Sequence, residues 1–97
     1  MEFLVHIKLS WGEMTPDEKA QMTKDEHKRA AELTKQGHLV RMWRVPCRFE
    51  NWGLWRAKNA TELHEVITSL PAFKIMHDID VLPLAKHAVD PSPPPDA

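Results

Sequence analysis

The stretch that decides the fold is LVRMWRVPCRFENWGLWRA, residues 39–57. Two runs rich in aromatic and branched apolar residues, 39–45 and 49–57, flank a short segment that begins at Pro46. Such residues favour extended backbone, and a short break between two such runs is typical of an antiparallel hairpin. The centre of the chain is therefore predicted to be a β-hairpin, and the elements on either side of it determine the fold class.

A helix is predicted on each side of this hairpin. Residues 15–18, TPDE, combine a capping threonine, a proline suited to the first helical position and a glutamate that completes a capping box. The helix should cover residues 16–36 and stop at Gly37. Residues 59–62, NATE, carry a second capping signal, and the helix they open should end at Pro71.

The two ends of the chain supply the outer strands. Residues 3–9 alternate between apolar and other side chains, and residues 75–82 form a plausible last strand. The order β-α-β-β-α-β is the ferredoxin-like plan, an α+β fold in which both helices cover one face of a four-stranded antiparallel sheet. We expect one domain over residues 1–88 and a proline-rich tail, residues 89–97, that joins neither helix nor sheet.

The hairpin strands carry apolar or aromatic side chains on both faces. Strict alternation gives Leu39 and Trp43 against Val40 and Met42, and Trp55 against Trp52 and Leu54. The ferredoxin-like plan leaves one sheet face without helices, and an apolar face of that size is expected to be covered by another subunit. The sequence therefore predicts a homo-oligomer.

The composition excludes several classes of function. The 97 residues carry a net charge of −1 with both signs mixed, so there is no electrostatic case for binding nucleic acid or a membrane surface. We expect no signal peptide and no transmembrane segment, and the lone Cys47 fits a reducing, cytoplasmic compartment. The six histidines form no HxH or HxxxH pair, so no metal site is expected.

Glu26 is the most informative single residue. Steps of 100° along residues 16–36 put it on the side opposite the charged arc, among Met22, Ala30 and Leu33. A carboxylate there loses hydration, so its pKa should rise unless a cation or donor compensates, and such a group suits general acid–base catalysis. The alternative is a structural ion pair with a lysine or with Arg44.

A series of short motifs runs through the chain. In order, they are Asp25-Glu26, Gly37, Met42-Trp43-Arg44, Phe49-Glu50-Asn51, Leu63-His64-Glu65, Leu70-Pro71-Ala72-Phe73 and His87. This series resembles muconolactone isomerase and its close relative chloromuconolactone dehalogenase, from residue 3 to about residue 88. The chain departs from the family pattern at Phe49, at Lys74, near Arg56 and in residues 10–14, which lie at or near the expected pocket.

The resemblance implies a concrete activity. Family members have the ferredoxin-like fold, need no metal or organic cofactor, and assemble into rings of homodimers, typically decamers. They convert muconolactone, a five-membered unsaturated lactone with an acetate side chain, to 3-oxoadipate enol-lactone in aromatic degradation. The acid–base glutamate of the family matches Glu26, and its pocket arginine and asparagine match Arg44 and Asn51.

These residue types fit the chemistry. Shifting the lactone double bond requires removal of a carbon-bound proton and its return to another carbon, which one carboxylate of raised pKa can do. The dienolate intermediate needs a donor or cation, and the substrate carboxylate suits an arginine. Glu26, Arg44 and Asn51 supply these groups, and His6 and His64 are candidate further donors to the substrate.

Several alternatives remain open. A chloromuconolactone dehalogenase would use the same proton abstraction to expel chloride, and a related isomerase would act on another substrate. A non-catalytic oligomer would bind a small ligand or stabilise a partner. A cofactor-free oxygenase or haem-handling protein of this fold would present His64 or His77 to the pocket. Arg44 also fits an oligomer contact, Asn51 a turn, His64 a core or interface site and His6 an interface.

Overall fold

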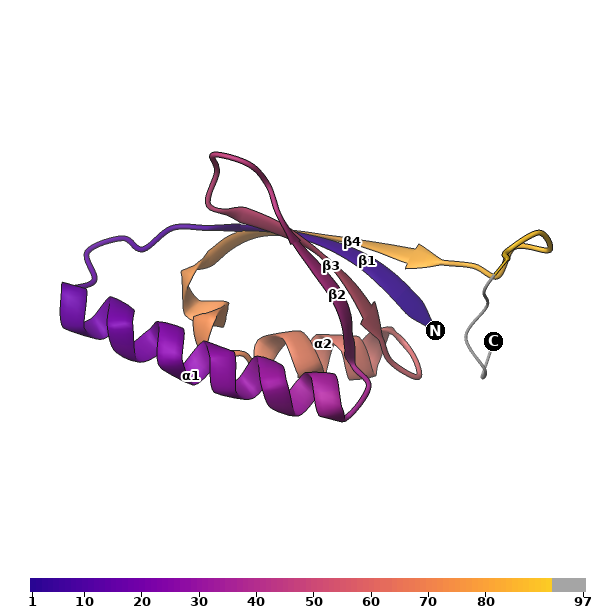
Figure 1. The fold of residues 1–97 in the computed structure, drawn as a ribbon, viewed down its shortest axis with the longest axis horizontal. Coiled ribbons are helices and arrows are strands. Elements are labelled where there is room, and N and C mark those ends of the chain that lie inside the picture. The colour runs from indigo at the N-terminus through magenta and orange to yellow at the C-terminus, as the bar shows by residue number, and fades with distance from the viewer. Residues whose placement is uncertain (92–97) are drawn as a thin grey trace.

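The computed structural model of the chain describes residues 1–91 and contains the predicted order of elements, β-α-β-β-α-β (Figure 1). The elements are β1 (Glu2–Leu9), α1 (Pro16–Lys35), β2 (Leu39–Arg44), β3 (Glu50–Arg56), α2 (Ala60–Thr68), the 3-10 helix η1 (Pro71–Ile75) and β4 (Met76–Leu84). The prediction of an α+β, ferredoxin-like fold is confirmed. Most of the predicted tail, residues 92–97, lies outside the described residues.

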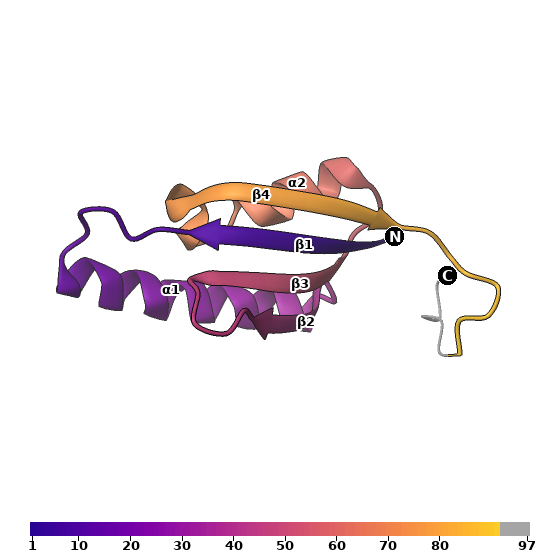
Figure 2. The ribbon, with the colours of Figure 1, turned by 90° about the horizontal axis from the view of Figure 1, so that it is seen from above.

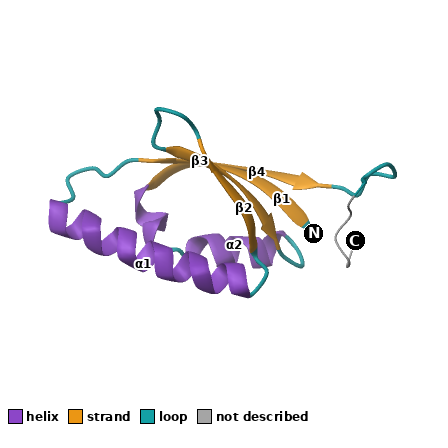
Figure 3. Cartoon of the chain, in the orientation of Figure 1, coloured by secondary structure: helices purple, strands orange, loops and turns teal. Residues whose placement is uncertain are grey.

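The strands form one antiparallel sheet in the order β2-β3-β1-β4, with the predicted hairpin at one side. Both helices lie on the same face of this sheet, as Figures 1 and 3 show from the side and Figure 2 from above. Each strand therefore has one row of side chains that faces the helices and one row on the outer face. None of the elements described within residues 1–91 covers the outer face.

Both helices begin where the sequence predicts. The Thr15 hydroxyl accepts from the Glu18 amide at 3.2 Å, and the Glu18 carboxylate accepts from the Thr15 amide at 3.0 Å, which completes the capping box. The Asn59 side chain accepts from the Glu62 amide at 2.9 Å and so caps α2. Gly37 has φ of 85°, the left-handed conformation in which glycine ends a helix without strain.

The connection from α2 to β4 contains a turn that the sequence pattern did not predict. α2 ends at Thr68, and η1 occupies Pro71–Ile75 before β4 begins at Met76. A single turn of 3-10 helix has no apolar periodicity of its own, which is why the pattern gives no signal for it. The turn lies beside α1 and has a direct consequence for the site described below.

The main core fills the space between the helices and the sheet. Its largest fully buried side chains are Trp55, Phe3, Ile7, Leu33 and Val5. A second, smaller cluster lies against the N-terminal half of α1, beside η1. Its buried members are Met22, Ala72 and Ile75, and the partly buried Leu9, Trp11, Met14 and Met76 pack against them.

A β-bulge in β2 changes which residues of the hairpin face the helices. The register with β3 shifts between Leu39 and Arg41. The observed pairs are Leu39 with Trp55, Met42 with Gly53, Trp43 with Trp52, and Arg44 with Asn51. The extra residue reverses the alternation, so the predicted grouping of Leu39 with Trp43 is wrong. Because of the bulge, Met42 and Arg44 share the helix-facing side with Leu39, and Trp43 lies on the outer face.

The outer face is apolar, as the sequence predicts. Trp43 and Leu84 are 42% and 40% exposed, and Leu82 is 52% exposed, although all three are large apolar side chains. Leu4 and Leu54 lie between them in the middle of the sheet and are half-buried. The cover expected from a second copy of the chain stays a prediction.

Candidate active site

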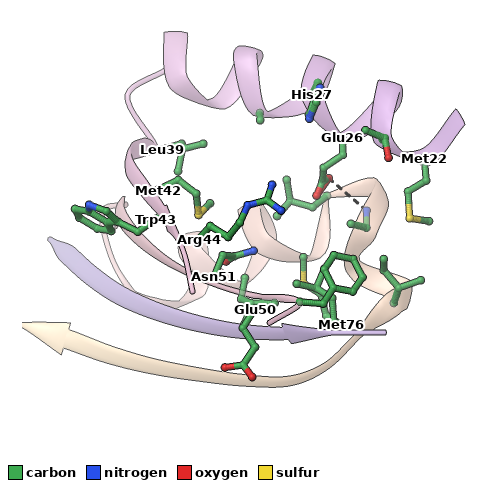
Figure 4. Close-up of a pocket in the computed structure, with 18 of the residues that line it drawn as sticks. Met22, Glu26, His27, Leu39, Met42, Trp43, Arg44, Glu50, Asn51 and Met76 are labelled. Atoms are coloured by element: carbon green, nitrogen blue, oxygen red, sulfur yellow. Dashed lines mark hydrogen bonds between the residues drawn. The ribbon is translucent and has the colours of Figure 1, made fainter. Parts of the chain in front are cut away.

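A cavity of about 620 Å³ lies between α1, η1 and the helix-facing side of the sheet (Figure 4). Most of the side chains that line it are apolar, and they come from both core clusters. Glu26 reaches it from α1, and Arg44 and Asn51 reach it from β2 and β3. The structure therefore brings together three residues that are separated by 18 and 7 positions in the sequence.

Glu26 has the environment that its helix position predicts. The side chain is half-buried beside Met22 and Ala30, and its Oε1 accepts from the Ala72 amide of η1 at 3.3 Å (dashed line in Figure 4). Burial raises the pKa of Glu26 and outweighs the Ala72 hydrogen bond and the nearby His27, which both lower it. The result is a carboxyl group with a pKa above its ordinary value, next to a cavity.

The alternative of a structural ion pair at Glu26 has no support in the described residues. Ion pairs within residues 1–91 join other carboxylates to lysine, arginine or histidine, and Glu26 is in none of them. Its one hydrogen bond there comes from the Ala72 amide. A partly buried carboxylate without a paired cation is a typical feature of acid–base sites.

Arg44 and Asn51 are opposite one another in the β2–β3 pair. Arg44 forms no ion pair within residues 1–91, and Asn51 Oδ1 is buried without a hydrogen-bond partner there. A buried amide without a partner costs free energy, and a ligand that supplies the partner recovers it. An unpaired guanidinium beside such an amide suits an anionic ligand, because arginine binds carboxylates through two parallel hydrogen bonds.

Several residues that line this cavity were not singled out from the sequence, and His27 and Trp55 are two examples. His27 lines it next to Glu26, and Trp55 forms part of its wall. Trp55 Nε1 is buried without a hydrogen-bond partner in residues 1–91, and a Cβ atom at Gly53 would collide with it. Neither residue had a signal in the sequence, because a tryptophan in a strand is typical of a core and a lone histidine on a helix is typical of a surface.

His6 and His64 do not line the cavity. His6 lies on the outer face of β1, where its Nε2 is 2.9 Å from Glu50 Oε1 and its ring stacks on Trp52 with centroids 4.4 Å apart. His64 is exposed on α2, and His77 is exposed on β4. Strand alternation directs His6 away from the helices. A role in substrate binding for His6 or His64 therefore has no support from the cavity of a single chain.

Two other classes of site have no counterpart in the described part of the chain. Within residues 1–91, no group of three or more histidine, cysteine, aspartate or glutamate side chains is placed to hold a metal ion. No helix in the same residues has the length and apolar character needed to cross a membrane. The cavity around Glu26 is therefore the main candidate site in this part of the chain.

Known proteins share this fold and this chain length. The family model described as muconolactone delta-isomerase matches residues 1–90. The chain belongs to the muconolactone delta-isomerase family. A crystal structure of muconolactone isomerase superposes with a TM-score of 0.85 and 26% sequence identity, covering 97% of this chain and 98% of that one. The predicted family is confirmed.

Individual family members are moderately similar in sequence. A muconolactone delta-isomerase of Rhodococcus opacus is 36% identical over 59 residues, which span 61% of this chain and 62% of that relative. That match therefore covers less than two thirds of the relative's length. A muconolactone delta-isomerase of Pseudomonas aeruginosa is 28% identical and covers 87% of this chain and 90% of the relative.

Proposed function

We propose that this member of the family is a cofactor-free isomerase that converts muconolactone to 3-oxoadipate enol-lactone in the degradation of aromatic compounds. The observation that carries the proposal is the position of Glu26, whose pKa is raised by burial and which shares a cavity with Arg44 and Asn51. The names of the relatives and of the matching crystal structure support the same reaction.

Glu26 is the proton carrier in this proposal. Its carboxylate removes the proton from the ring carbon that bears the acetate side chain, and the C–H electron pair enters the conjugated lactone as a dienolate. The same group, now a carboxylic acid, returns the proton to the ring carbon next to the carbonyl, and the double bond ends between the other two carbons. Both carbons lie on one small ring, so one side chain reaches them from one face.

Arg44 and Asn51 hold the substrate in this proposal. Arg44 binds the acetate carboxylate, and Asn51 donates to the lactone carbonyl, whose oxygen gains negative charge in the dienolate. The amide oxygen and nitrogen of Asn51 exchange places by a half-turn of the side chain, so either can face a ligand. A general base contributes about 10²–10⁴-fold to a rate, and one donor to a developing oxyanion about 10²–10³-fold.

We also propose that the chain works in the cytoplasm as a homo-oligomer of dimers arranged in a ring, a decamer as the family resemblance implies. The exposed apolar side chains of the outer face, Trp43, Leu82 and Leu84, support an assembly because a second copy would remove them from water. Sedimentation that shows a monomer at micromolar concentration would contradict the assembly.

The substitution Glu26→Gln tests the catalytic assignment. Glutamine keeps the shape and still accepts the hydrogen bond from the Ala72 amide, but it cannot take a proton, so kcat on muconolactone should fall by at least about 100-fold. The matched control is Asp25→Asn, which neutralises the exposed neighbouring carboxylate and should keep the wild-type rate. A near wild-type rate for Glu26→Gln would refute the assignment.

The same assays separate the rival functions. Chloride release from a chlorinated muconolactone, without turnover of muconolactone itself, would identify a dehalogenase. A haem absorption band after reconstitution, without turnover of either lactone, would identify a haem-handling protein. His64 and His77, the two histidines that the haem-handling alternative would use, are exposed and do not line the cavity.

A further inference from the structure

The cavity has a polar part and an apolar part. Glu26, Arg44 and Asn51 gather in the polar part, near the middle of the cavity (Figure 4). The apolar part lies toward η1, and Figure 4 shows Met22 on the side of Glu26 away from Arg44 and Met76 below Glu26, toward the sheet. We call this part the methionine wall; its residues are Met22, Met76, Ile75, Trp11 and Phe49.

The methionine wall is built from four segments: Met22 belongs to α1, and the other three segments are fastened to one another. Trp11 follows β1 and stacks on Phe49 of the β2–β3 loop, with ring centroids 5.0 Å apart and 26° between the planes. The Leu9 amide donates to the Phe49 carbonyl at 3.0 Å, and the Ser10 amide donates to the Ile75 carbonyl of η1 at 2.9 Å. These bonds hold the wall in place beside the cavity, so it is available to contact a bound ligand.

The cavity is large for the parent lactone. Its volume of about 620 Å³ is within the range of about 300–1,000 Å³ that is typical of sites for drug-sized ligands. Muconolactone has only about ten non-hydrogen atoms, most of them in or next to polar groups that Glu26, Arg44 and Asn51 would engage. The parent compound held by these groups would fill only part of this cavity, which leaves room beside the methionine wall.

Resting on the proposed function, we propose that the preferred substrate is a lactone acid whose ring carries an apolar substituent, and that this substituent lies against the methionine wall. Methionine side chains are flexible and polarisable, and with aromatic neighbours they adapt to alkyl or aryl groups. Among the ring carbons of the double-bond system, the middle one neither loses nor gains a proton. A substituent there leaves the proton transfer intact.

A substrate series tests the inference. The wild-type protein would be assayed with muconolactone and with analogues that carry methyl, ethyl or phenyl at this middle carbon. One added carbon in a matching apolar pocket changes specificity by about 10–200-fold, so kcat/KM for at least one substituted lactone should exceed that for muconolactone by about 10-fold or more.

Two substitutions in the methionine wall test whether its residues cause this substrate preference. Met22→Ala and Met76→Ala should each lower the ratio of kcat/KM for the best substituted lactone to that for muconolactone, by about 10-fold. The matched control is Met14→Ala, since Met14 packs against the same small cluster but does not line the cavity. Thermal unfolding of each variant identifies any that fails to fold, in which case the other wall variant decides.

The outcomes distinguish this inference from the function on which it rests. If muconolactone is the best substrate and every substituent lowers kcat/KM, the inference is wrong and the isomerase proposal stands. If the ratio falls equally in Met14→Ala, the methionine wall does not set the preference and the inference is again wrong. If the folded protein isomerises none of the lactones, the proposed function fails and the inference fails with it.

Discussion

A partly buried glutamate lies on each side of the sheet, and the two have different neighbours. On the helix-facing side, Glu26 meets one backbone amide and forms no ion pair within residues 1–91. On the outer face, Glu50 is 15% exposed but lies 2.9 Å from His6 Nε2 and 3.7 Å from Arg48 Nη1. Burial without a paired cation raises the pKa of Glu26. Glu26 is a candidate base because it is partly buried and has no paired cation, whereas Glu50 has His6 and Arg48 as partners.

Removal of the arginine from the cavity should weaken substrate binding. Arg44→Ala deletes the group proposed to bind the substrate carboxylate, and a hydrogen bond to a charged group contributes about 1.5–3 kcal/mol. We expect KM for muconolactone to rise by about 10–100-fold. The control is Arg41→Ala on the same strand, since Arg41 stacks on the outer-face Trp43 and does not line the cavity. Equal effects of both substitutions would argue against a specific contact by Arg44.

A cation placed next to Glu26 would make it resemble Glu50. The substitution Ala30→Lys puts an ammonium group one helical turn after Glu26, on the same side of α1. The cation favours the ionised carboxylate and should lower the pKa of Glu26, which makes it a weaker base. We expect kcat/KM at neutral pH to fall by about 10-fold, relative to the uncharged and similarly long Ala30→Met.

The pH dependence of kcat/KM should show the same change in the pKa of Glu26. In the wild type, kcat/KM should fall as the pH drops through the raised pKa of Glu26, because the protonated group cannot act as a base. This acidic limb should move to lower pH in Ala30→Lys and stay in place in Ala30→Met. A limb that is the same in all three proteins would show that Glu26 does not control it.

Replacing glutamate by glutamine should change the stability in opposite directions at Glu26 and at Glu50. The folded-state pKa of Glu26 is raised, so the folded protein binds a proton at Glu26 more tightly than the unfolded chain does. The stabilisation from this difference is fully present at low pH and is lost as the pH rises through the raised pKa. Glu26→Gln should therefore raise the melting temperature at neutral pH relative to the wild type, with a smaller difference in acid. Glu50→Gln keeps an acceptor oxygen for His6 but removes the negative charge that Arg48 and the His6 hydrogen bond meet, and should lower stability by about 1 kcal/mol.

Calorimetry or thermal circular dichroism at two pH values would measure both effects. A loss of stability in Glu26→Gln at neutral pH would contradict the account of Glu26 as a carboxylate destabilised by burial. A gain of stability in Glu50→Gln would contradict the account of Glu50 as a paired group. Both substitutions replace glutamate by glutamine, so a difference between their effects on stability comes from the surroundings of the two side chains.

Local signals predicted most of the fold. The capping residues at Thr15 and Asn59 mark helix starts correctly, because a cap involves only neighbours in the chain. The position of Glu26 on the apolar side of α1 follows from helix geometry alone. The β-bulge after Leu39 was missed, since one extra residue in a strand depends on the partner strand and leaves no mark in the local pattern.

The candidate site was predicted in part. Glu26 was named from its helical position, and Arg44 and Asn51 from the family resemblance; the three do share a cavity, whereas their roles stay predictions. His6 was correctly expected on the face opposite Phe3 and Val5, but the sequence did not show that the cavity lies on the other side. The Ala72 amide was missed because a backbone group has no side-chain signature.

By itself, the sequence determined the order of the elements, the two helix starts and the presence of an acidic side chain on an apolar helical face, because these depend on dihedral preferences and periodicity over a few residues. Only the tertiary structure decided which groups meet that side chain. The bulge in β2 turned Arg44 toward the helices, and η1 brought the Ala72 amide to Glu26. Solvation and hydrogen bonding act through space, so the environment of a carboxylate is a property of the assembled fold.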